Sequence, residues 1–239
     1  MEKKYTFEDF LQIIKTLRSD NGCPWDREQT HESLKPCVVE EAAELCGAIR
    51  IYDTTGDPEN MIEELGDLLL QVVMHSEIAE EEKIFNIEDV IDVVSKKMIR
   101  RHPHVFGNAK ADNSEQVLIN WDEIKKEEKK GKAWIESPLR EIPIELPALT
   151  RAVKVTKKVD KLYESRNTYT ESIAELKEII TKLETMEPTA YDKELSDSIG
   201  DVLIEIANVC RIYKLTPEQI LTDKVEDLIE KFESNKGIR

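Results

Sequence analysis

The chain has 239 residues, of which 50 are acidic and 34 are basic, so its formal net charge is −16. This balance argues against a protein whose main function is to bind nucleic acid, because such domains carry a basic surface. Only eight glycines and nine prolines occur, too few for a turn-rich all-β chain, whereas 40% hydrophobic and 35% charged residues are typical of amphipathic helices.

Apolar residues recur at helical period through most of the chain. A polar stretch at residues 19–26 is expected to be a loop, and residues 53–58 interrupt the pattern again. Pro103 is expected to stop a helix that precedes it. The first half therefore predicts helices over residues 7–17, 36–52, 59–81, 87–101 and 114–130.

A segment with three prolines, residues 133–147, is the best candidate for a linker. Helical periodicity returns beyond it, over residues 148–164, 171–185, 191–213 and 217–234. We therefore predict an N-terminal domain over residues 1–132 and a C-terminal domain over residues 148–239, both all-α.

The two halves also resemble each other. EEAAEL at residues 40–45 and ELGDLL at residues 64–69 have counterparts in ESIAEL at residues 171–176 and SIGDVL at residues 198–203. A similar pair of helices has been used twice, which supports the division into two domains.

Two acid pairs in the first half share a three-residue spacing, Glu41 with Glu44 and Glu64 with Asp67. On a helix each pair lies on one face. We expect each pair to lie beside an apolar stripe, formed by Val38, Ala42, Leu45 and Ile49 in one helix and by Met61, Leu65, Leu68 and Val72 in the other.

Antiparallel packing of these helices would bring four carboxylates together. Like charges about 4 Å apart repel by roughly 4 kcal/mol at an effective dielectric of 20, so such a group needs a cation or raised pKa values. Oxygen ligands favour Mg²⁺ or Mn²⁺. The residues alone leave two interpretations open, a metal site or the solvated edge of a charged helix.

The EExxE motif at residues 40–44, followed by ExxD at residues 64–67, resembles the signature of the MazG family of all-α nucleoside triphosphate pyrophosphohydrolases. NGCPWDREQT at residues 21–30 and RRHPHVF at residues 100–106 strengthen the resemblance, which covers nearly the whole chain. It implies two MazG-like helical-bundle domains. It also implies a reaction in which NTP or dNTP and water give NMP or dNMP and pyrophosphate, with Mg²⁺ as the cofactor and Mn²⁺ as a substitute.

The resemblance also implies roles for single residues. Glu41, Glu44, Glu64 and Asp67 would be the metal ligands. Glu40, with Glu41 beside it, is the candidate catalytic position for orienting or deprotonating the attacking water.

An acidic protein needs local positive charge to bind a triphosphate. Lys97, Arg100 and Arg101 can face one site, and the resemblance implies that this basic segment contacts phosphates; the alternative is a basic helix end favoured by the helix dipole. Trp25 is expected either to stack on the nucleobase or to fill the end of the bundle as core. Lys35 is a weaker candidate for a phosphate contact.

The second half departs from the motif. Ser172 and Ser198 stand where the first half has glutamates, and only Glu175 and Asp201 remain as acids. Neutral hydroxyls are poor replacements for carboxylates in Mg²⁺ binding. We therefore expect a degenerate metal site in the C-terminal domain.

The partners and the compartment follow from the remaining features. No apolar run approaches the roughly 18 residues of a membrane span, so we expect no membrane association. Small helical halves with wide apolar faces predict a homodimer. The cysteines form no CxxC pair, so we expect reduced thiols and a cytoplasmic protein; they are Cys23, Cys37, Cys46 and Cys210.

Two alternatives to a general pyrophosphohydrolase stay open at this point. One is an all-α dUTPase or dCTPase with narrow base specificity. The other is a helical pseudoenzyme, an adaptor or nucleotide sensor that binds nucleotides without turnover.

Overall fold

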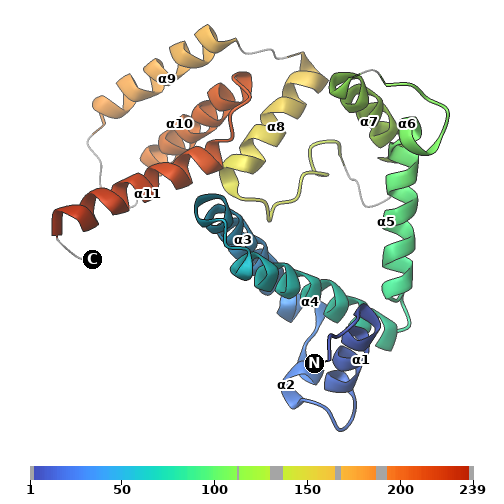
Figure 1. Ribbon diagram of the computed structural model, residues 1–239. Coiled ribbons are helices and arrows are strands. Elements are labelled where there is room, and N and C mark those ends of the chain that lie inside the picture. The colour runs from blue at the N-terminus through green and yellow to red at the C-terminus, as the bar shows by residue number, and fades with distance from the viewer. Residues whose placement is uncertain (1–2, 112, 130–136, 165–167, 187–192, 237–239) are drawn as a thin grey trace. The chain divides into compact units, whose positions relative to one another are not determined.

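The computed structural model describes residues 3–111, 113–129, 137–164, 168–186 and 193–236, and this part of the chain contains helices and no strand (Figure 1). The all-α class predicted from the composition is therefore confirmed. The chain divides into two compact units, Met1–Lys130 and Gly131–Arg239. Residues 133–136 of the predicted linker lie outside the described residues, and the exact domain limits stay a prediction.

The helices of the first unit agree closely with the periodicity of the sequence. The described ones are α1 (Phe7–Arg18), α2 (Pro24–Glu28), α3 (His31–Thr55), α4 (Glu59–Glu81), α5 (Ile87–Arg101), α6 (Pro103–Phe106) and α7 (Ser114–Lys129). The predicted loop at residues 19–26 is in part wrong, because α2 begins inside it with Pro24 in its first turn, where proline is tolerated.

Side-chain caps explain where α1, α3 and α5 begin. Thr6 and Asn86 form capping boxes with the third residue of α1 and α5, respectively. Thr30 does the same for α3, which therefore begins at His31 and not at the predicted Pro36. Gly56 ends α3 with a φ of 74°, a left-handed conformation that glycine adopts without strain.

The short connection after Gly56 makes α3 and α4 antiparallel neighbours. Helix α1 packs on the C-terminal half of α4. The core of the unit lies where these three helices meet, and its buried residues are Ile14, Leu34, Val73, Met74 and Ile78.

Two polar contacts join the same helices. Arg18, at the end of α1, donates to both carboxylate oxygens of Glu81 at 2.9 and 2.7 Å. His31 and His75 link α3 to α4 through a 2.8 Å contact between their Nδ1 atoms, with the two rings parallel within 2°. Since one Nδ1 must donate and the other accept, this bond requires at least one neutral imidazole.

The predicted apolar stripes of α3 and α4 are only partly correct. Ile49 on α3 and Leu65 on α4 are 49% and 50% exposed. Met74 and Ile78 face the core. The residues on the same face of α4, at successive turns before Met74, face α3 and are polar: Gln71, Asp67 and Glu64. The acids of α4 therefore lie on the inner face, and much of the apolar surface is left outside.

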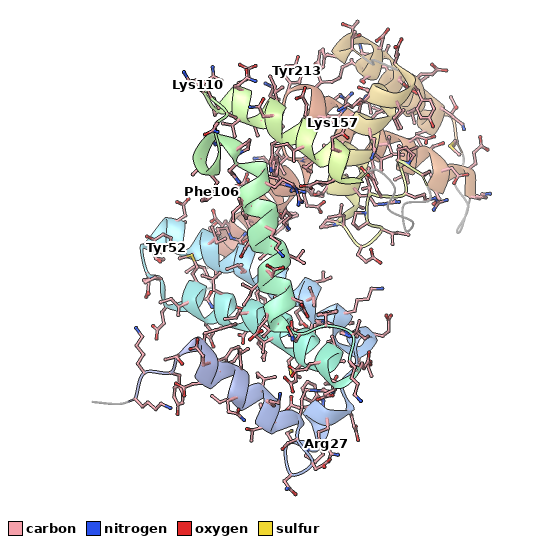
Figure 2. The ribbon with its side chains drawn as sticks, turned by 90° about the vertical axis from the view of Figure 1, so that its right-hand side faces the viewer. Arg27, Tyr52, Phe106, Lys110, Lys157 and Tyr213 are labelled. Atoms are coloured by element: carbon pink, nitrogen blue, oxygen red, sulfur yellow. The ribbon has the colours of Figure 1, made fainter. Side chains whose placement is uncertain are left out.

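Several other large apolar side chains also project from the first unit. Tyr52 near the end of α3 and Phe106 in α6 extend outward, with 43% and 62% of their surface exposed (Figure 2). On α5, Val93 and Ile99 are 65% and 52% exposed. Burial of these exposed side chains against a partner would remove apolar area from water.

The second unit is also built around one central helix. Its described helices are α8 (Ala148–Tyr163), α9 (Tyr169–Glu184), α10 (Lys193–Ile212) and α11 (Pro217–Lys236). Helix α10 contacts the other three. Its inner face is partly polar, and Arg211 at its end donates to Asn208 and pairs with Asp160 of α8 at 2.6 Å. Of the helices described, none is long and apolar enough to cross a membrane.

Candidate metal centre

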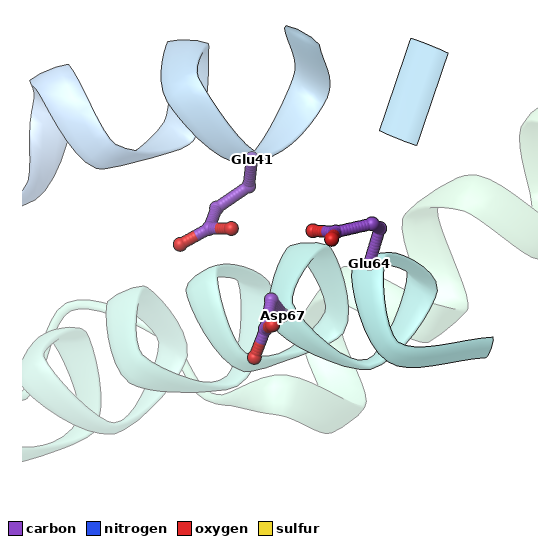
Figure 3. A group of neighbouring side chains, drawn as sticks. All are labelled: Glu41, Glu64 and Asp67. Carbon is purple, nitrogen blue, oxygen red and sulfur yellow. The ribbon is translucent and has the colours of Figure 1, made fainter. Parts of the chain in front are cut away.

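Three carboxylates meet where α3 and α4 face each other. Glu41 extends from α3, and Glu64 and Asp67 extend from successive turns of α4 (Figure 3). One ligand atom from each lies within 4.8 Å of the other two. All three side chains are half-buried. The structure therefore brings together three of the four acids that the sequence predicted as metal ligands.

The remaining acids of EExxE lie at the edge of this cluster. Glu44 and Glu40 are both exposed. The pKa of Glu44 is raised, first by desolvation and then by the negative charges of Glu64, Glu41 and Glu40. Protonation of Glu44 becomes easier because carboxylates crowd this end of the helix pair, and a bound cation would relieve the same repulsion.

Gln71, which the sequence analysis did not single out, lies next to the carboxylates. It is 93% buried, one turn after Asp67 on the inner face of α4, and its Nε2 donates to Glu41 Oε1 over a long 3.5 Å. Its Oε1 has no hydrogen-bond partner among the described residues. Its position four residues after Asp67 was the available signal. Three carboxylates beside an unpaired amide oxygen fit a hard divalent cation.

The predicted phosphate-binding arginines lie elsewhere in the unit. Arg100 and Arg101, at the end of α5, both bind Glu128 of α7. Helix α5 contacts α4, α6 and α7, and within the described chain neither arginine forms an ion pair with the three carboxylates. Lys97, one turn earlier on α5, is half-buried.

Trp121, which the sequence analysis did not select, lies beside Arg101. The Arg101 guanidinium lies 5.4 Å from the centre of its ring, and the Lys125 ammonium lies 4.6 Å from it. Its indole Nε1 is buried and has no hydrogen-bond partner among the described residues. An aromatic residue four positions before a lysine in a predicted helix was the signal.

The other two predicted substrate contacts are on the surface. Trp25 lies in α2 with 62% of its surface exposed, so it does not fill the core of this unit. Lys35 is exposed on the first turns of α3, with its Nζ 3.9 Å from Glu32. Their contacts with a nucleotide stay predictions.

Comparison with known proteins decides the family. Residues 29–106 match the model of the MazG nucleotide pyrophosphohydrolase domain. The chain is 40% identical to the nucleoside triphosphate pyrophosphohydrolase/pyrophosphatase MazG of Thermotoga maritima over 230 residues, which are 95% of this chain and 84% of that protein. It belongs to the MazG family.

Other MazG relatives extend the same similarity. The nucleoside triphosphate pyrophosphohydrolase of Escherichia coli is 37% identical over 236 residues, 92% of this chain and 83% of that protein. The uncharacterized protein YabN of Bacillus subtilis is 43% identical over 219 residues, which are 91% of this chain but only 44% of that protein. The chain thus spans less than half of the Bacillus protein.

The MazG domain match lies within the first unit, and the second unit differs from it at the helix pair. Ser172 is fully buried and accepts a hydrogen bond from Asn208 at 2.9 Å. The pKa of Glu175, one turn later on α9, is raised first by the charge of Glu205 and then by desolvation.

The two MazG-like helix pairs share a Gly-Asp pair, at residues 66–67 and 200–201. Counted from it, Glu205 of α10 takes the place of Gln71. Gln71 contacts Glu41 in the first unit, and in the second unit the charge of Glu205 raises the pKa of Glu175. In the described chain only the first unit brings three ligand atoms within 4.8 Å, so a degenerate second site stays our prediction.

Proposed function

We propose that the first unit is a Mg²⁺-dependent nucleoside triphosphate pyrophosphohydrolase, in which Mn²⁺ can replace Mg²⁺. The products would be a nucleoside monophosphate and pyrophosphate. The observation that carries the proposal is the approach of Glu41, Glu64 and Asp67 within 4.8 Å, in a chain of the MazG family. The names of the Thermotoga and Escherichia relatives support the same reaction.

The three carboxylates, with Glu44 at their edge, would hold the cation. When bound, a divalent cation neutralises charge on phosphate oxygens and makes water more acidic. Glu40 lies on the exposed edge beside Glu41 and is the candidate to orient the attacking water and accept its proton. The attacking water forms a bond between its oxygen and the α-phosphorus. The bond between the α-phosphorus and the oxygen that bridges to the β-phosphorus breaks, so that pyrophosphate leaves.

Positive side chains would hold the triphosphate. Arg100 and Arg101 can each grip phosphate oxygens with two N–H groups, and Lys97 and Lys35 add charge. Trp25 is exposed and does not pack in the core, so its ring is available to stack on a base. In a chain of net charge −16, such local cations are needed to bring a triphosphate to a carboxylate cluster.

We further infer that the protein is a homodimer. Among the described residues the three carboxylates form no ion pair with Arg100 or Arg101, and apolar residues of α3, α4 and α5 are half-exposed. Burial of such a surface against a second copy stabilises by about 25 cal/mol per Å² of apolar area. The inference of a cytoplasmic protein depends on the four thiols, which are free.

The decisive experiment is a panel of ribo- and deoxynucleoside triphosphates incubated with Mg²⁺ and the purified protein, with every product identified. We expect a monophosphate and pyrophosphate. A nucleoside diphosphate and phosphate would exclude attack at the α-phosphorus. Turnover of dUTP or dCTP alone would indicate the narrow-specificity alternative, and nucleotide binding without products would indicate a pseudoenzyme.

A further inference from the structure

The two arginines proposed to bind phosphate already hold a carboxylate. Glu128 Oε1 accepts from Arg100 Nε at 2.8 Å, and the Arg100 Nη2 lies 2.6 Å from the same oxygen. Glu128 Oε2 accepts from Arg101 Nε and Nη2 at 3.1 and 2.5 Å. Only 13% of the Glu128 side chain and 15% of the Arg101 side chain are exposed. Two guanidinium groups thus converge on one anion.

The arrangement is one that a phosphate group would also satisfy. Carboxylate and phosphate oxygens accept the same forked pair of N–H groups from arginine. The ring of Trp121 lies 5.4 Å from the Arg101 guanidinium and restricts its orientation. Hydrogen bonds from Arg101 and Arg100 lower the pKa of Glu128 to about 2, so this carboxylate stays charged at any physiological pH. Only a competing anion, and not a change of pH, can therefore replace it.

We propose that Glu128 is a tethered competitor of the substrate, an internal carboxylate that fills the anion site of Arg100 and Arg101 until a triphosphate displaces it. This proposal rests on the proposed function of the two arginines. A triphosphate carries about four negative charges and can outcompete one carboxylate, whereas a neutral nucleoside cannot. Every ligand that uses the two arginines then binds more weakly by the same factor, so both substrate and product affinity are reduced.

The test is Glu128→Gln, which keeps the shape of the side chain and removes its charge. Glu123→Gln on the same helix is the matched control, because Glu123 is exposed and the change in net charge is the same. We expect the variant at residue 128 to lower the KM for triphosphates roughly threefold to tenfold, as expected for loss of a partly buried charged pair. Inhibition by pyrophosphate should strengthen by the same factor, and the control should behave as the wild type.

An unchanged or higher KM in Glu128→Gln would overturn the proposal. The ion pairs of Glu128 with the two arginines would then serve only to join α7 to α5. Should this variant not fold, Glu128→Asp keeps the charge but shortens the reach by one methylene, and it should lower the KM in the same direction. Tripolyphosphate binding, measured by calorimetry without turnover, separates the two proposals. If tripolyphosphate binds more tightly to Glu128→Gln than to the wild type but neither protein hydrolyses a nucleoside triphosphate, the enzymatic function is refuted and the competitor role of Glu128 is retained. If tripolyphosphate binds equally to both proteins, only the competitor role is refuted.

Discussion

Replacing Asp67 with asparagine should abolish turnover and still make the metal-free protein more stable. The carboxylate oxygens of Glu41, Glu64 and Asp67 lie within 4.8 Å of one another. At an effective dielectric of 20, each pair of charges at that separation repels by about 3 kcal/mol, and solvent around half-buried groups reduces this to about 1 kcal/mol.

The substitution removes two of the three pairwise repulsions. We therefore expect the free energy of unfolding to rise by about 1–2 kcal/mol without metal, which corresponds to roughly 3–6 °C in Tm. An amide is a poor ligand for Mg²⁺, so the further stabilisation that the wild type gains with Mg²⁺ should disappear. Glu41→Gln should behave in the same way.

The assay is thermal unfolding with and without saturating Mg²⁺, together with pyrophosphate release and Mg²⁺ binding by calorimetry. Glu63→Gln is the matched control, because Glu63 is exposed on the same helix and carries the same charge. The control should keep both activity and the Mg²⁺-dependent rise in Tm. If Asp67→Asn keeps near-normal turnover at saturating Mg²⁺, or loses stability without the ion, the three acids are not the cation site.

Three further predictions concern other parts of the molecule. Arg101→Ala should raise KM or lower kcat for triphosphates by the equivalent of roughly 1.5–3 kcal/mol, with Mg²⁺ binding unchanged in titrations without nucleotide; an effect on Tm alone would contradict a phosphate contact. Desolvation and the charge of His31 lower the pKa of His75, so its contribution to stability is present above the ordinary pKa of 6.5 and is lost as pH falls through the lower folded value. Urea unfolding should therefore show a loss of stability between about pH 7 and pH 5 that is smaller in His75→Phe; an equal loss in that variant would contradict it. A fragment of residues 1–132 should release pyrophosphate if it still dimerises, and a fragment starting at residue 146 should release little, measured at matched concentration with the oligomeric state checked; activity in the second fragment alone would reverse our assignment of the site.

Much of the local structure could be predicted from the sequence. The limits of α4 and α5 agree with the predicted ranges, 59–81 and 87–101, because periodicity, prolines and capping residues act over a few neighbouring positions. The spacing of Glu64 and Asp67 places them on one face of any helix that contains them. The all-α class and the pairing of α3 with α4 follow from the same local signals.

The direction in which that face points was decided by tertiary structure. Periodicity alone favoured an inward stripe through Leu65. In the structure α1 packs on Val73 and Met74, and this contact orients Gln71 and the acids of α4 toward α3. An amphipathic pattern with apolar residues on nearly every side does not specify which of them face the core.

The carboxylate that pairs with Arg100 and Arg101 likewise could not be predicted from the sequence. Glu128 lies 27 positions after Arg101, and nothing in the spacing distinguishes it from its acidic neighbours. Only the packing of α7 against α5 brings the two together. The sequence thus determined which residues share a helix face, because that depends on bonds between near neighbours, and the tertiary structure decided which faces meet, because that depends on contacts between residues distant in the chain.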